Sequence, residues 1–413
     1  MDAPQRLLLS LQRQGSCSEL PQFGVNFHPN RAPDDVNLNL ISESLAQAVR
    51  FDIPWMDVER QGIFELGRYD NLINKLRQNG ETIVLLLAYG HPDHSDGYAR
   101  GGFPLPPSNP EQRAAYGRYV QAVAQRYHGR DIVYEIWNEP NFAFFWPPAP
   151  DAESYGKLLT EAARAIRQVV PTATIIPGGL ANENNPSGFL NQLATAGALD
   201  GLNANNFHPY RQDAPEHSVY DIAKVESAVT DRAPSQIWLT EWGYSESWLT
   251  QRSQDTRRSQ AFMVARLMLT AALVRARAAL LYDLIDDGTN PGDQESSFGL
   301  YDYNFKPKEA ATAFKTIIDS TSQCDNYEFS IDPARGIITA SFMRKADTSY
   351  VIWSYMAERS QSYCFDAGKI QRADLKDVFG NGIVLSACSG SAGFNLKLSD
   401  SIGPLILTTR RTQ

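Results

Sequence analysis

Short apolar segments alternate with longer, periodic segments between about residues 20 and 320. The short segments are rich in aliphatic and β-branched residues, as are strands that are buried on both faces. The longer segments repeat their apolar positions with a helical period, so the alternation predicts a parallel sheet covered by helices. Strands are predicted at residues 23–27, 48–52, 82–88, 132–137, 174–177, 201–207, 236–240 and 279–284. Eight such strands fit a closed (β/α)8 TIM barrel, an α/β fold.

Two of the predicted helices have clear boundary signals. One opens at Pro110 and runs towards Tyr127, and another opens at Asp151 and runs towards Val170, where Pro171 ends it. Asp before a helix and Pro at its first position are typical of helix N-termini.

The pattern changes near residue 320. From residue 327 to residue 409, strand-like alternation is interrupted by turn clusters such as Phe-Gly-Asn-Gly at 379–382. We therefore predict a barrel at 20–320 and a small all-β, sandwich-like domain at 321–413. Residues 1–19 are assigned to a leader segment, which lacks the basic start, long apolar run and small-residue cleavage site of a signal peptide.

The composition fits a folded chain with a large core and narrows the classes of partner. The chain has 413 residues, 43% of them hydrophobic, and its 38 Lys and Arg against 47 Asp and Glu give a net charge of −9. Since nucleic-acid binding needs clustered Lys and Arg, and no such cluster occurs, no nucleic-acid partner is expected. No apolar run reaches the length of about 18 residues that a membrane span requires.

The cysteines leave two alternatives open. Cys17, Cys324, Cys364 and Cys388 show no CxxC spacing and no histidine partner for a zinc site. Cys364 and Cys388 lie in strand-like sequence and would pair in an oxidising compartment. The alternative is four unpaired, buried thiols.

Two glutamates follow predicted strands at the end where barrel enzymes carry their ligands. The sequence Trp-Asn-Glu-Pro-Asn at 137–141 follows the fourth strand, and Thr-Glu-Trp-Gly at 240–243 follows the seventh. A carboxylate that leaves a buried strand is costly to desolvate unless it has partners, so Glu139 and Glu241 are candidate functional residues.

With these motifs the sequence resembles the clan A glycoside hydrolases, and most closely glycoside hydrolase family 39, which includes exopolysaccharide-degrading enzymes of the PslG type. Further matching motifs are Val-Arg-Phe-Asp at 49–52, Phe-His-Pro-Tyr at 207–210 and Phe-Gly-Leu at 298–300. The resemblance implies hydrolysis of glycosidic bonds with retention, with Glu139 as acid/base and Glu241 as nucleophile. At 282–284 the chain has Tyr-Asp-Leu where many relatives carry a Trp near the sugar ring.

The positions of the two glutamates are compatible with the retaining hydrolysis that the resemblance implies. Retaining hydrolysis needs two carboxyl groups about 5–5.5 Å apart on opposite sides of the anomeric carbon. Strands four and seven lie across a barrel mouth, so glutamates at their ends can face each other. An ionised Glu241 raises the pKa of Glu139 by repulsion, which keeps a proton available for the leaving oxygen.

Four polar residues are expected to support the two glutamates. The resemblance makes Asn138 a donor to the sugar 2-hydroxyl, the alternative being a turn-forming Asn. Arg50 is expected to hold Glu241 ionised, the alternative being a structural ion pair with Asp52. The resemblance makes Tyr210 the aromatic hydroxyl that contacts the nucleophile. His208 is given a binding role, the alternative being a hydrogen-bonded core residue.

Aromatic and loop residues complete the predicted site, because rings stack on the apolar faces of sugars. Trp146 is the preferred platform for a sugar, and Trp242 and Tyr282 are further candidates. The loop after strand three, which includes His91, is expected to form a substrate-contacting rim, with a metal site as the lesser alternative. Glu135, inside strand four, is expected to be a hydrogen-bonded residue of the barrel interior.

These features together predict a retaining glycoside hydrolase that cleaves a polysaccharide, endo-acting on an exopolysaccharide or a plant-type glycan. The alternatives are an exo-acting, β-xylosidase-like enzyme, a transglycosylase and a non-catalytic carbohydrate-binding barrel. Two glutamates and water suffice for the reaction, so no cofactor and no metal are expected. A monomer is expected, and the substrate class implies a secreted, periplasmic or cell-surface location.

Overall fold

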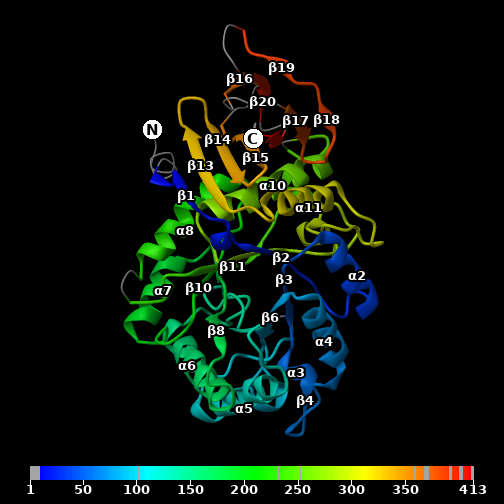
Figure 1. Ribbon diagram of the computed structural model, residues 1–413. Helices are drawn as coiled ribbons and strands as arrows, with labels where there is room; N and C mark the ends of the chain where they lie inside the picture. Colours follow the sequence, from blue (N-terminus) through cyan, green and yellow to red (C-terminus); the bar gives the residue numbers. More distant parts are fainter. Residues whose placement is uncertain are drawn as a thin grey trace.

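The computed structural model describes residues 10–99, 102–229, 232–251, 253–356, 360–366, 372–389, 393–399 and 403–410. A ring of helices surrounds a parallel sheet, and antiparallel strands from both ends of the chain lie beside helices α10 and α11 (Figure 1). None of the helices in these residues combines the length and the apolarity needed to cross a membrane.

All eight predicted barrel strands are present. With β9, a two-residue strand that was not predicted, they form a nine-stranded sheet in the order β8-β7-β6-β3-β2-β12-β11-β10-β9, which is parallel at every pairing. The (β/α)8 prediction is therefore confirmed. The strands are β2 (Gln22–Asn26), β3 (Ala48–Asp52), β6 (Thr82–Leu87), β7 (Ile132–Ile136), β8 (Thr174–Pro177), β9 (Leu180–Ala181), β10 (Asn205–His208), β11 (Ile237–Trp242) and β12 (Ala278–Leu281).

Hydrogen bonds close the seam between β8 and the segment that leads into β10. The backbone N–H of Asn203 donates to the carbonyl of Ile175 over 3.0 Å. Nδ2 of Asn206 donates to the carbonyl of Pro177 over 3.1 Å. These bonds bring the fifth and sixth barrel strands together, so the carboxyl ends of all eight strands surround one mouth.

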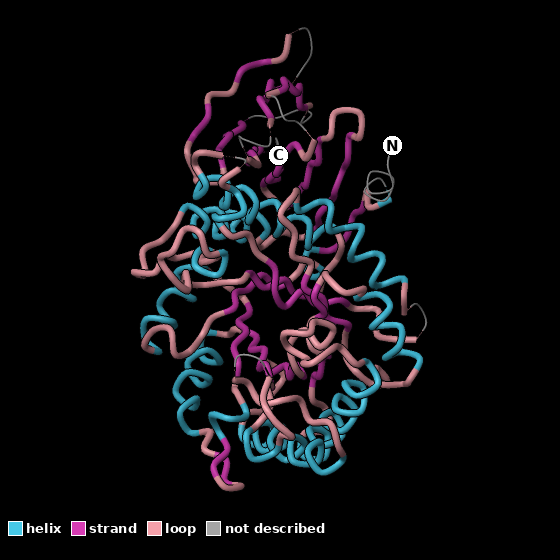
Figure 2. Tube along the Cα trace, turned by 180° about the vertical axis from the view of Figure 1, so that it is seen from behind, coloured by secondary structure: helices cyan, strands magenta, loops and turns pink. Residues whose placement is uncertain are grey.

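Helices cover the outside of the barrel (Figure 2). Both predicted start signals are confirmed: Pro110 is the first residue of α5, and the side chain of Asp151 caps α6 by accepting from Ser154 N. The cap of α5 is Asn109, whose side chain accepts from Gln112 N. The helices are α2 (Asp34–Ser44), α4 (Asp70–Asn79), α5 (Pro110–Arg126), α6 (Ala152–Val169), α7 (Pro186–Thr195), α8 (Ser218–Ser227), α10 (Thr256–Leu273) and α11 (Glu309–Thr321).

The barrel interior has an apolar layer below a polar one. The apolar layer consists of Ala48, Val84, Val133, Ile176, Ala204, Trp238, Ala278 and Leu280. Because side chains two positions apart on a strand face the same side, the next residues towards the carboxyl ends also point inward. They include buried polar groups, namely Arg50, Glu135, Asn206 and Thr240. The polar residues at the mouth of the barrel therefore lie directly above an apolar layer.

The C-terminal strands form two antiparallel sheets with a core between them, as the sandwich-like prediction requires. That core consists of Ile337, Ile352, Phe365, Leu375, Leu396, Leu398, Leu405 and Leu407. The larger sheet has the order β1 (Arg13–Ser16), β13 (Asn326–Asp332), β14 (Ile337–Met343), β15 (Asp347–Ser354), β21 (Leu405–Arg410), β17 (Arg372–Asp377) and β18 (Gly382–Ile383). The smaller has the order β16 (Gln361–Phe365), β20 (Phe394–Leu398) and β19 (Ser386–Ala387).

The larger sheet packs directly against the barrel helices. Trp353 Nε1 donates to Oε1 of Glu216 over 2.7 Å, and Glu216 forms a buried ion pair with Arg266 of α10. Gly403 approaches the ring of Phe262 so closely that an added Cβ would lie 2.2 Å from Cδ1. The all-β part thus shares a core with the barrel and covers the outer face of α10.

The start of the chain is tied to the C-terminal sheet. Residues 13–16, assigned above to a leader segment, form β1 and pair with β13 from Arg13↔Phe329 to Ser16↔Asn326. A disulfide between Cys17 and Cys324 follows directly. The domain boundaries at 19/20 and 320/321 themselves stay a prediction.

Both cysteine pairs are disulfides. Pairing of Cys364 with Cys388 is confirmed, and the alternative of four unpaired thiols is wrong. The pairing of Cys17 with Cys324 was not predicted, because nothing in a spacing of 307 residues indicates it. Chain-entropy arguments assign a cross-link over so long a loop about 6 kcal/mol of stabilisation.

Candidate active site

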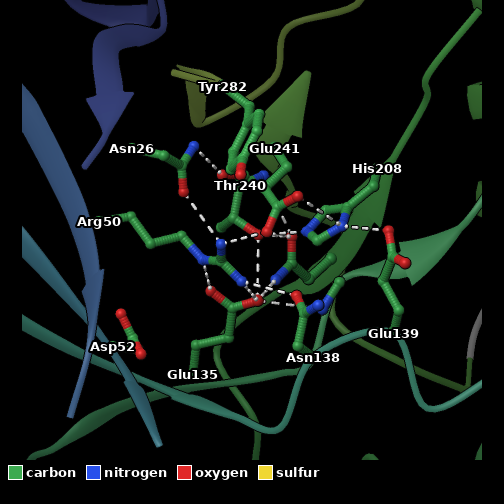
Figure 3. A network of polar contacts seen from close by, with 12 residues as sticks. Asn26, Arg50, Asp52, Glu135, Asn138, Glu139, His208, Thr240, Glu241 and Tyr282 are labelled. Carbon is green, nitrogen blue, oxygen red and sulfur yellow. Dashed lines mark hydrogen bonds and ion pairs between the residues drawn. The ribbon is translucent and has the colours of Figure 1, made fainter. Parts of the chain in front are cut away.

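Glu139 and Glu241 lie on either side of the His208 ring at the mouth of the barrel (Figure 3). Glu139 follows β7 and Glu241 lies near the end of β11. One carboxylate oxygen of each, together with a ring nitrogen of His208, lie within 4.8 Å of one another. We call Glu139 and Glu241 the glutamate pair.

The backbone before Glu139 is held in an unusual conformation. Trp137 and Glu139 have positive φ angles of 71° and 44°, which cost about 1–3 kcal/mol each for residues other than glycine. Hydrogen bonds from Trp137 N to Leu87 O (3.1 Å) and from Glu139 N to Gly179 O (3.0 Å) fix this turn. A Cβ at Gly179 would lie 2.0 Å from Nε2 of His208, so only glycine allows this close approach.

Glu241 is surrounded by hydrogen-bond donors. Arg50 donates from Nη1 to Oε1, and the hydroxyl of Tyr210 donates to Oε2 over 3.2 Å. His208 Nδ1 lies 3.8 Å from the same Oε2. Burial raises the pKa of Glu241, but the charges of His208 and Arg50 outweigh burial and leave this pKa below its usual range. Glu241 is therefore the ionised member of the pair.

Arg50 is the centre of a buried network. Its Nε and Nη2 donate to Glu135 over 2.6 and 3.1 Å, its Nη1 also donates to Asn26 over 2.9 Å, and its Nη2 also donates to Asn138 over 2.9 Å. With the bond to Glu241, all five N–H groups of the guanidinium have an acceptor. The guanidinium is thereby locked against the carboxylate of Glu241.

The alternative for Arg50 was an ion pair with Asp52. The guanidinium pairs with Glu135 and Glu241 instead, and Asp52 lies 3.9 Å from Nδ1 of His28. The side chain of Asp52 is 30% exposed, whereas that of Glu135 is fully buried. The charge of Arg50 thus faces the mouth of the barrel.

His208 connects Glu139 to the polar layer. Its Nδ1 lies 2.9 Å from Oε1 of Glu139 and its Nε2 lies 2.9 Å from Oγ1 of Thr240. That hydroxyl donates to Glu135 (3.1 Å) or Asn206 (3.0 Å), both of which present oxygen acceptors. It therefore accepts from Nε2–H, and Nδ1 is the nitrogen that lies against Oε1 of Glu139. Burial lowers the pKa of His208, but the charge of Glu241 and the hydrogen bond and charge of Glu139 outweigh burial and raise it.

The pKa of Glu139 is shifted opposite to that of Glu241. Burial is the largest cause and raises the pKa of Glu139, and the charge of Glu241 raises it further. The hydrogen bond and charge of His208 oppose this shift without cancelling it. The two neighbouring carboxyl groups thus have pKa values shifted apart, as those of an acid and a nucleophile must be.

Other predicted polar residues also lie in the network. Asn138 is buried and its Oδ1 accepts from Arg50, which orients the amide so that its nitrogen is the end presented to a ligand. Tyr282 follows β12, and its hydroxyl donates to Oδ2 of Asp287 over 3.1 Å. Asn26, Thr240 and Asn206 were not predicted as part of this network, although each lies at an inward-facing strand position.

Two predicted aromatic contacts are wrong. Trp146 is 3% exposed and packs edge-on against Trp137 and Tyr155, with ring centroids 5.2 and 5.5 Å apart, so it is no sugar platform. The loop winds back after Phe142, whose carbonyl accepts from Trp146 N over 2.9 Å. Trp242 has no exposed surface and belongs to the core.

The binding role predicted for His91 is also wrong. The side chain is 4% exposed, its Nδ1 accepts from Asp93 N over 3.1 Å, and its Nε2 lies 3.3 Å from Glu59 O. His94 in the same loop bonds Glu59 Oε1 over 3.1 Å. These histidines fix the loop to the neighbouring segment.

Two groups of donors in the described part of the chain have a spacing that suits a metal ion. The first is the glutamate pair with His208. The positive charge of Arg50, which is paired with Glu241, would repel a metal ion at this place. The second is His28, Asp283 and Asp287. Burial opposes the charged ring of His28, but Asp52 and Asp283 outweigh it and raise its pKa to about 9. A protonated imidazole is a poor metal ligand.

The fold of this chain is similar to those of solved glycoside hydrolase structures. No protein-family model and no curated protein matches the sequence. Among solved structures, a family 39 glycoside hydrolase from the gut symbiont Bacteroides cellulosilyticus WH2 is similar with a TM-score of 0.77 and 23% identity, over 95% of this chain and 82% of that one.

Two further structures extend over almost all of both chains. The GH39 enzyme from Xanthomonas axonopodis pv. citri has a TM-score of 0.68 and 14% identity, covering 98% of this chain and 96% of that one. A monomeric beta-xylosidase from Caulobacter crescentus CB15 has a TM-score of 0.68 and 14% identity, covering 95% and 97%. At such identities the likeness shows a shared fold, a barrel with an attached β domain.

Proposed function

We propose that the chain is a retaining glycoside hydrolase of clan A, most similar to family 39, that cleaves a polysaccharide by double displacement. The observation that carries this proposal is the glutamate pair, with oxygens within 4.8 Å and pKa values shifted in opposite directions. Inverting enzymes separate their carboxyl groups by about 6.5–9.5 Å to admit a water, which is wider than this site.

In the first step, Glu241 attacks the anomeric carbon and forms an ester bond to it. The bond between that carbon and the glycosidic oxygen breaks, and Glu139 gives its proton to the departing oxygen. Arg50 and Tyr210 hold the attacking carboxylate ionised and in place. The free end of the Asn138 amide is available for the 2-hydroxyl of the sugar.

In the second step, a water hydrolyses the ester. Once Glu241 is esterified it carries no charge, so one cause of the raised pKa of Glu139 disappears. Glu139, which gave up its proton in the first step, therefore stays ionised until it takes a proton from the attacking water, whose oxygen joins the anomeric carbon. Glu241 departs as a carboxylate, and both residues return to their starting states.

The two disulfides support a location outside the cytoplasm, because such cross-links persist in oxidising compartments. We therefore propose that the protein is secreted, periplasmic or on the cell surface. Endo action on a chain-like glycan is the favoured mode, because long loops rich in aromatic residues follow β6 and β7. Exo action is the alternative, since one similar structure is a β-xylosidase.

A screen of polysaccharides tests the proposed function and its mode. Xylan, β-glucan, mannan and bacterial exopolysaccharides are incubated with the protein, and the products are analysed by mass spectrometry. Oligosaccharides of several lengths are expected early in the reaction. Release of monosaccharide alone would contradict endo action. Failure to cleave any of the polysaccharides or an aryl glycoside would contradict the proposal that the protein is a glycoside hydrolase.

Replacement of His208 by Asn is expected to shift the pH profile of activity to higher pH. Activity needs Glu241 ionised and Glu139 protonated, so the acidic limb follows Glu241 and the alkaline limb follows Glu139. The charge of His208 lowers the pKa of both. Without the imidazole both pKa values rise, and both limbs of kcat/KM for an aryl glycoside shift to higher pH.

His128→Asn is the matched control, because His128 is exposed beyond the end of α5. Its profile is expected to coincide with that of the native chain. If both limbs of the His208 variant also stayed in place, His208 would not tune the pair.

A further inference from the structure

Four aromatic side chains form a continuous surface beside the barrel mouth, which we call the aromatic shelf. It consists of Tyr89 and Phe103 from the loop after β6, and Phe144 and Phe145 from the loop after β7. A small hollow of about 50 Å³ lies among them, lined also by Pro104, Trp137 and Pro147. None of the residues lining this hollow carries a charge.

The rings touch one another from solvent inward. The ring of Phe103 lies edge-on to that of Phe144, with ring centroids 6.4 Å apart, and the centroids of Phe144 and Phe145 are 4.9 Å apart. Phe145 stacks on Tyr89 at 5.8 Å with an interplanar angle of 12°. Tyr89 in turn meets Trp137 edge-on at 5.6 Å. The aromatic shelf is therefore one surface built from two loops.

The outer rings are open to solvent. Phe144 is 61% exposed and Phe103 is 51% exposed. Single exposed apolar residues are common on proteins, but contiguous ones rimming a mouth indicate a binding surface. These rings occupy the place where the sequence suggested Trp146 as a platform.

The aromatic shelf is fixed in place and connected to the glutamate pair. Trp137 Nε1 donates to Phe145 O over 2.9 Å, and Trp137 lies two residues before Glu139. In the other loop, a Cβ on Gly90 would lie 2.6 Å from Leu105 O, so close packing holds this loop as well. A surface already ordered before binding loses little conformational entropy when a ligand arrives.

We propose that the aromatic shelf is a distal subsite that holds one uncharged pyranose residue of a glycan chain extending beyond the scissile bond. This inference rests on the proposed function. The C–H face of a pyranose stacks on an aromatic ring, and the uncharged lining gives no partner to a uronate or an ammonium group. The subsite thus selects neutral glycans longer than the two sugars that flank the cleaved bond.

The double variant Phe103→Ala/Phe144→Ala tests this subsite by binding. A Glu241→Gln background prevents turnover, and calorimetry measures affinity for neutral, uronate-containing and amino-sugar oligosaccharides of four to six units. Neutral oligosaccharides are expected to bind and to lose affinity at least about tenfold in the double variant. Tyr220→Ala, which removes an exposed ring on α8, is expected to change nothing.

Three results would overturn the proposed subsite. They are binding of charged oligosaccharides only, no binding of any oligosaccharide, or equal affinities of Glu241→Gln with and without the double substitution. A change of oligomeric state in the double variant, measured by sedimentation, would also overturn it by assigning the aromatic shelf to a second copy of the chain. Hydrolysis of a short aryl glycoside is measured in parallel with Glu241 intact. The double variant is expected to retain it, whereas its absence from the native chain as well would contradict the proposed function itself.

Discussion

Replacement of Glu241 by Gln is expected to reduce kcat/KM for an aryl glycoside on the order of 10⁴-fold or more, as loss of a nucleophile does in enzymes with covalent intermediates. Gln has nearly the same shape but cannot form the ester with the anomeric carbon. Its amide also replaces a carboxylate that accepts from Arg50 and Tyr210. Circular dichroism establishes that the variant is folded, and steady-state kinetics measures the loss.

Glu241→Ala extends this test because it leaves space for a small anion. Azide is expected to restore turnover by attacking the anomeric carbon from the vacated side, giving a glycosyl azide of opposite configuration to the substrate. Glu153→Gln, at an exposed position of α6, is the matched control and is expected to keep full activity. Full activity in Glu241→Gln would show that another residue attacks the sugar.

Replacement of Glu139 by Gln is expected to cost about 10²–10⁴-fold, and the loss depends on the leaving group. A poor leaving group, such as another sugar, needs the proton that Glu139 supplies. 4-Nitrophenolate departs with little help, so with this substrate the first step survives and the second becomes limiting. A burst of nitrophenolate followed by a slow steady state is expected in stopped-flow kinetics.

Azide again separates the roles of the two glutamates. In Glu139→Ala it is expected to attack the glycosyl-enzyme and to give a glycosyl azide with the configuration of the substrate. An equal loss of activity for good and poor leaving groups would contradict the assignment of Glu139 as acid/base.

The barrel could be predicted because its strands are buried on both faces. Such strands have an apolar composition that separates them from the amphipathic helices, and all eight were located. Strand periodicity accounts for the buried polar layer as well: Glu135 is hydrogen-bonded within the interior, as expected, by Arg50, Thr240 and Asn206. The glutamates could be found because the carboxyl ends of barrel strands limit where the chemistry lies.

Contacts between distant segments could not be predicted. The pairing of Cys17 with Cys324, and of β1 with β13, joins segments about 300 residues apart, where local spacing carries no information. Which aromatic side chains of the loops are buried and which are exposed could not be predicted either. Trp146 and Phe144 are two residues apart in one loop, yet the former is 3% and the latter 61% exposed, because a turn beginning at Phe142 folds Trp146 inward.

Trapping the glycosyl-enzyme tests the central proposal most directly. A 2-deoxy-2-fluoro glycoside with an activated leaving group slows both steps, but slows the second more, so the ester accumulates. Digestion and mass spectrometry are then expected to find one fluorosugar on the peptide that contains Glu241, and none in Glu241→Gln. A label on any other residue, or turnover of the native sugar with inversion of the anomeric centre, would contradict double displacement through Glu241.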